Sequence, residues 1–77
     1  MQNRQQVRIS TKNLAGSKIE YTVQASKDSA LRVISSEKLS MESLDYIVQQ
    51  HLRKNHRGRF PKRMNETIEI PSFRFIE

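Results

Sequence analysis

Positive charge is concentrated in one stretch of this sequence, and the residue types there suit phosphate binding. Between Asp45 and Glu66 there is no acidic residue, while lysine and arginine are frequent. The net charge of the whole chain is +6, and the residues outside this stretch balance to zero. A neutral body with one basic stretch predicts a localised anionic partner. We call residues 53–63 the basic segment; its cations are Arg53, Lys54, Arg57, Arg59, Lys62 and Arg63.

The basic segment combines side chains that can contact a nucleic-acid backbone. Arginine forks donate two hydrogen bonds to a phosphate, and lysine adds a compact charge. Neutralising several phosphates releases counterions, so the affinity should fall steeply as salt rises. An aromatic ring among the cations can also stack on an unpaired base. We therefore predict a small protein that binds DNA, RNA or another polyanion through Arg53, Lys54, His56, Arg57, Arg59, Phe60, Lys62 and Arg63.

Other interpretations of the basic segment stay open. The negative end of a helix dipole favours nearby cations, which accounts for Arg53 and Lys54 and can extend to Arg57, but not for the cations beyond Gly58. Phe60 can instead cover the open end of the core. The chain can also be a small adaptor or inhibitor that docks the segment on an acidic protein. Under that interpretation it can also add its last residues, Phe73 to Glu77, to the sheet edge of a partner.

The sequence predicts no enzyme, no metal site and no cofactor. His51 and His56 are five residues apart, so we expect them not to share a helical face as a zinc pair would, and no cysteine is present. A ribonuclease site built from both histidines and nearby cations, with Tyr46 helping, is chemically conceivable, but it needs a pocket that a short chain rarely builds. No serine stands in a nucleophile motif. We expect Glu66 and Glu69 on the solvent side of the last strand.

The length and composition limit the class of protein. A chain of 77 residues forms at most one domain and buries only about 60% of its unfolded surface. No cysteine is available for a disulfide, and no stretch approaches the ~18 apolar residues of a membrane span. The polar N-terminus lacks the apolar part of a secretory signal, so we expect a cytoplasmic protein. An exposed edge strand makes it a candidate for homodimerisation.

Alternating apolar residues predict the first three strands. Residues 6–12 and 18–24 each show a period of two, and the five residues between them contain Asn13 and Gly16, which favour a turn. These two runs therefore predict a β-hairpin. Residues 30–36 fit either a strand or a short helix. We favour the strand, because Val33 and Ile34 lose side-chain freedom in a helix.

The next element is the most clearly patterned. Ser40 is suited to cap a helix, and an apolar stripe that includes Leu44, Val48 and Leu52 recurs at helical spacing. The pattern predicts a helix over residues 41–55 that ends before Gly58. Beyond the basic segment, Ile68 and Ile70 predict a strand, and residues 73–75 alternate again after a proline.

These elements predict an α+β fold in the order β-β-β-α-β, with a small antiparallel sheet covered on one face by a single helix. Residues 1–5 are expected to form a polar tail on this single domain. The predicted core consists of Val7, Ile9, Ile19, Tyr21, Val23, Leu31, Val33, Leu44, Ile47, Val48, Leu52, Ile68, Ile70, Phe73 and Phe75.

Overall fold

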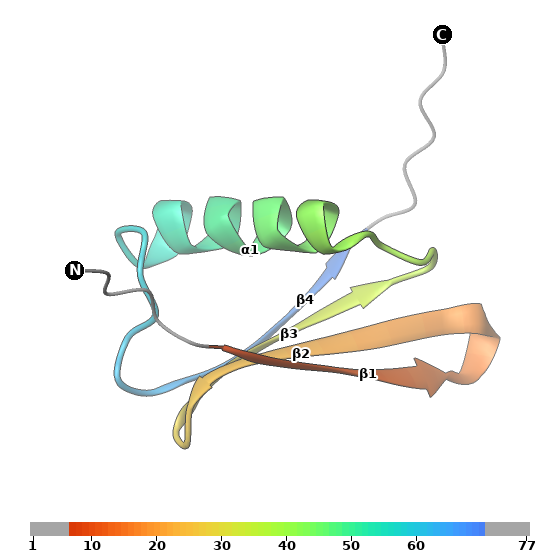
Figure 1. The fold of residues 1–77 in the computed structure, drawn as a ribbon, viewed down its shortest axis with the longest axis horizontal. Coiled ribbons are helices and arrows are strands. Elements are labelled where there is room, and N and C mark those ends of the chain that lie inside the picture. Colours follow the sequence, from red (N-terminus) through yellow and green to blue (C-terminus); the bar gives the residue numbers. More distant parts are fainter. Residues whose placement is uncertain (1–6, 71–77) are drawn as a thin grey trace, which may run out of the picture.

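The computed structural model describes residues 7–70, which form one sheet with a helix packed on one of its faces (Figure 1). The predicted α+β class and the predicted order of elements are confirmed. Among the described residues, no helix is long and apolar enough to cross a membrane. The elements are β1 (Arg8–Leu14), a 3-10 turn (Ala15–Ser17), β2 (Lys18–Ser26), β3 (Ser29–Ser35), α1 (Met41–Asn55) and β4 (Met64–Ile70).

The four strands lie in the order β1-β2-β3-β4, and the direction of the last strand corrects the prediction of an antiparallel sheet. β1, β2 and β3 pair antiparallel, whereas β4 runs parallel to β3 with Met64 opposite Ser29. The reason is the crossover: α1 carries the chain back along the sheet, so β4 starts at the end where β3 started. The sheet is therefore mixed.

The core lies between α1 and the facing side of the sheet. Strand residues alternate in burial, so that β3 buries Leu31 and Val33 and leaves Arg32 half-exposed. The helix buries Leu44, Val48 and Leu52, as its apolar stripe predicts. The complete buried cluster is Tyr21, Val23, Leu31, Val33, Leu44, Val48, Leu52 and Met64, with Ile19, Leu39, Ile47, Phe60, Ile68 and Ile70 packed around it.

Two residues of the predicted core are exposed at the edge of the sheet. Val7 is 40% exposed and Ile9 is 36% exposed. β1 is an edge strand whose residues are all exposed apart from half-buried Leu14. Met64 is buried, although the sequence pattern did not predict it as a core residue. The predicted core residues Phe73 and Phe75 lie outside the described residues, as does the polar tail.

The N-cap of α1 supports a first prediction, which concerns stability. The Ser40 hydroxyl accepts a hydrogen bond from the Ser43 amide at 3.1 Å. Ser40→Ala should lower the free energy of unfolding by about 1 kcal/mol, while Ser40→Asp should retain it. Urea unfolding followed by circular dichroism measures both. Ser36→Ala, an exposed serine in the loop before the helix, is the control, and an equal loss there would show that the cap contributes nothing specific.

Candidate nucleic-acid interface

The basic segment begins on the last turn of α1 and leaves the helix through a tight reversal. The amides of His56 and Gly58 both donate to the carbonyl of Leu52, at 2.6 and 2.9 Å. Arg57 and Gly58 have φ angles of 57° and 85°, so two consecutive residues are left-handed. Glycine adopts this conformation without a steric cost, which suits it to the end of a helix. The chain thus turns sharply out of the helix toward β4.

Four inward-facing residues hold the loop that follows. Phe60 and Pro61 are half-buried, and Phe60 packs against the core cluster. Met64 is buried, and its amide donates to the Asp28 carbonyl at 3.0 Å, which fastens the end of the loop to the β2–β3 turn. His56 is held by the carboxylate of Glu66, which lies on β4. The loop is therefore anchored along its length.

The six cations of the basic segment are exposed, and the last four of them lie between these anchors in the sequence. Arg53 and Lys54 occupy the last turn of α1. Among residues 7–70, none of the six forms an ion pair with a carboxylate; the only lysine that does is Lys18, bound to Glu69 at 2.8 Å. Their charges are thus not neutralised within the described part of the molecule. The exposed cations are Arg53, Lys54, Arg57, Arg59, Lys62 and Arg63.

His56 and Phe60 were expected to support phosphate and base contacts, and the structure places both on the inner side of the loop. The ring of Phe60 packs on the core, as in the alternative in which it covers the open end of the core. The Nε2 atom of His56 lies 3.1 Å from a carboxylate oxygen of Glu66. These two side chains therefore act as anchors of the loop, and the cations form its outer surface.

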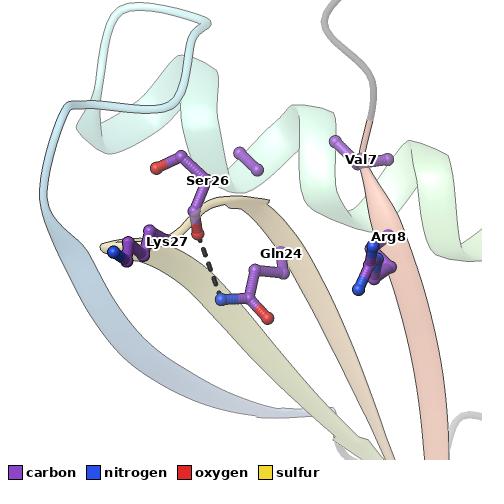
Figure 2. Close-up of a pocket in the computed structure, with 6 residues that line it drawn as sticks. Val7, Arg8, Gln24, Ser26 and Lys27 are labelled. Atoms are coloured by element: carbon purple, nitrogen blue, oxygen red, sulfur yellow. Dashed lines mark hydrogen bonds between the residues drawn. The ribbon is translucent and has the colours of Figure 1, made fainter.

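Two further cations lie at the same end of the sheet. β1 starts, β2 ends and β4 starts at this end, close to the loop after α1 (Figure 1). Figure 2 shows Arg8 and Lys27 here, around a hollow also lined by Val7, Gln24, Ala25 and Ser26, in which the Gln24 amide donates to the Ser26 carbonyl at 3.0 Å. Sequence reasoning missed these two cations, because only the strand pairing brings them together at the end of the sheet where β4 starts.

A cluster of two histidines and one glutamate joins α1, the loop and β4. His51 Nε2 lies 2.7 Å from Glu66 Oε1, and His56 Nε2 lies 3.1 Å from Glu66 Oε2. The two imidazole rings are 5.8 Å apart between centroids. His56 follows the last helical residue, so the two histidines do not share a helical face. The expectation that Glu66 would lie on the solvent side of the strand with Glu69 was wrong. Both rings converge on Glu66, which shares the helix-facing side of β4 with half-buried Ile68 and Ile70.

The cluster should make the free energy of unfolding depend on pH in the acid range. Hydrogen bonds from His51 and His56 hold the pKa of Glu66 below its ordinary value of 4.5. A carboxyl group whose pKa is lowered by folding contributes stability above its unfolded pKa, and this contribution is lost as the pH falls through the folded value. In the presence of a chelator, the difference in unfolding free energy between the wild type and Glu66→Gln should therefore shrink below about pH 4.5.

Urea titrations at several pH values measure this difference. Glu69→Gln, on the open face of β4, is the matched control, because its exposed pair with Lys18 is worth about 0–1 kcal/mol at most. A difference between the wild type and Glu66→Gln that stays constant down to pH 3 would contradict the prediction.

The structure brings together the two histidines of the ribonuclease alternative but not Tyr46. Tyr46 is 65% exposed on α1, and within the described residues no hydrogen bond joins it to the histidine cluster. Acidic residues of the helix, Glu42 and Asp45, lie in its first half, away from the basic segment.

No family model, curated protein or solved structure matches this chain. Function is therefore inferred from the geometry of the chain itself.

Proposed function

We propose that this protein is a non-enzymatic nucleic-acid-binding protein that contacts phosphates through the exposed cations of the basic segment. The observation that carries the proposal is the division of the loop: its inward side chains anchor it, and its outward cations have no carboxylate partner among residues 7–70. The anchors fix the backbone of the loop in the absence of a ligand, so little of the binding free energy should be lost in ordering that backbone.

The helix itself works against phosphate binding at this place. The C-terminus of a helix carries roughly half a negative charge, which repels an anion. The six cations of the segment exceed this charge many times over. Attraction therefore comes from side chains, and the proposed binding is electrostatic with little sequence preference.

The salt dependence of binding is the direct test. If all six cations contact phosphates, a plot of log affinity against log salt should have a slope of about −4 for single strands and about −5 for duplexes. Fluorescence anisotropy titrations of labelled DNA and RNA, single- and double-stranded, between about 50 and 200 mM salt measure it. Heparin as a competitor separates a preference for nucleic acid from general polyanion binding.

Two results would count against the proposal. One is an affinity for every nucleic acid weaker than about 10⁻⁴ M at physiological salt, which is below non-specific binding. The other is a tight interaction without salt dependence, because contacts to phosphates must release counterions. A partner that survives nuclease treatment in a pull-down would instead favour the adaptor alternative with an acidic protein.

A further inference from the structure

We propose that His51, His56 and Glu66 form a binding site for a divalent transition-metal ion, with Zn²⁺ as the ion that these ligands favour. The three residues come from α1, the end of α1 and β4, and one ligand atom of each lies within 4.8 Å of the others. Two imidazole nitrogens and a carboxylate oxygen are a ligand set that zinc accepts. The site goes beyond the proposed nucleic-acid binding and does not depend on it.

Two of the three separations between ligand atoms are close to those of a tetrahedral site. Zinc bonds to nitrogen and oxygen of about 2.0–2.2 Å place neighbouring ligand atoms roughly 3.3 Å apart. Glu66 Oε1 lies 2.7 Å from His51 Nε2 and 3.2 Å from His56 Nε2, so these two separations need to open by about 0.6 and 0.1 Å. A ligand nitrogen of each histidine lies within 4.8 Å of the other. The side chain of Glu66 is 39% exposed and has room to make this adjustment.

The two histidine ligands are already positioned. Their side chains are only 16% and 20% exposed, so packing restricts their movement. His51 lies inside the helix, and the amide of His56 is fixed by its bond to Leu52. Asn55 lies beside His51, with its Nδ2 3.3 Å from His51 Nδ1. When Nε2 binds a metal, the ring proton resides on Nδ1, and the Asn55 amide oxygen can accept it after the side chain rotates.

Three protein ligands leave one coordination position for water or an anion. A groove between α1 and β4 extends to His51 and is also lined by Ile47, Gln50, Arg53, Lys54 and Ile68. The nearby cations weaken the binding of a dication. The same cations favour an anion at the remaining position, since Zn²⁺ with one carboxylate leaves the centre positive.

Isothermal titration of the full chain, free of any tag, with Zn²⁺ alone tests the site. The chain contains only two histidines, so a one-to-one stoichiometry is expected. His51→Gln, His56→Gln and Glu66→Gln should each lower the zinc affinity by at least about 10-fold, and Glu69→Gln should leave it unchanged. Mg²⁺ should not compete, because it prefers an all-oxygen shell. Absence of zinc binding to the wild type would overturn the proposal.

A second measurement needs no substituted variant, which matters because the cluster also holds the loop. Co²⁺ in place of Zn²⁺ should give intense tetrahedral visible absorption and two paramagnetically shifted imidazole N–H signals in the NMR spectrum. Octahedral absorption, or the absence of shifted imidazole signals, would show that the cluster is a hydrogen-bonded clamp. Equal zinc affinity in the wild type and a folded Glu66→Gln variant would show the same.

Discussion

Replacing Arg59, Lys62 and Arg63 together with glutamine should weaken binding to a single-stranded oligonucleotide on the order of 100-fold at about 0.1 M salt. Each phosphate contact contributes about 0.7 to the salt slope, so three lost contacts also reduce the slope by about 2. The three side chains are exposed and lie outside the helix, so the fold should be unaffected. Anisotropy titrations at several salt concentrations give both quantities.

The matched control removes three cations from the other end of the molecule. Lys12, Lys18 and Lys38 lie at the end of β1, at the start of β2 and before α1. Replacing all three with glutamine changes the net charge by the same amount and breaks one exposed ion pair, between Lys18 and Glu69. The affinity of this control should fall far less. Equal losses in the two variants would mean that net charge, and not the basic segment, determines binding.

Leu31→Ala should cause the largest loss of stability, about 2–5 kcal/mol in the free energy of unfolding. Leu31 is 0% exposed in β3, between β2 and β4 and beneath the helix, so a cavity left there has little room to collapse. A domain of this size has a total stability of only about 4–12 kcal/mol. The thermal midpoint should therefore fall by more than about 10 °C.

Urea and thermal unfolding followed by circular dichroism measure this loss. Ile34→Ala is the control on the same strand, since Ile34 is half-exposed on the open face and should cost only about 1 kcal/mol. Below its unfolding transition, Leu31→Ala should keep the wild-type salt slope for nucleic acid, because the core carries no contact to phosphate. A changed slope in the folded variant would contradict the separation of scaffold and binding surface.

The sequence predicted the elements well because their signals are local. The cap at Ser40 and the stripe from Leu44 to Leu52 fix the helix, and alternation fixes the first three strands. The ambiguous residues 30–36 are confirmed as a strand, whose β-branched side chains suit the sheet. The direction of β4 was not predicted correctly, since it depends on the path of the crossover and not on any residue within the strand.

The sequence also predicted only part of the candidate site. The sequence alone shows that cations are concentrated between residues 53 and 63 and that no acidic residue lies among them in the chain. The inward orientation of His56 and Phe60 could not be predicted, because it depends on Glu66 and on the core cluster, which these two side chains contact in the folded chain. One signal for the histidine cluster was present and missed: Glu66 is in phase with Ile68 and Ile70, which places it on the helix-facing side of the strand.

By itself, the amino-acid sequence determined which segments are helix or strand and where the surplus positive charge lies. Both are properties of neighbours along the chain, governed by backbone periodicity and residue type. Tertiary structure alone decided that β4 runs parallel to β3, that Arg8 and Lys27 lie together at one end of the sheet, and that two histidines share one carboxylate. Those arrangements join residues distant in sequence; strand pairing selects the second of them, and the packing of α1 across the sheet selects the other two.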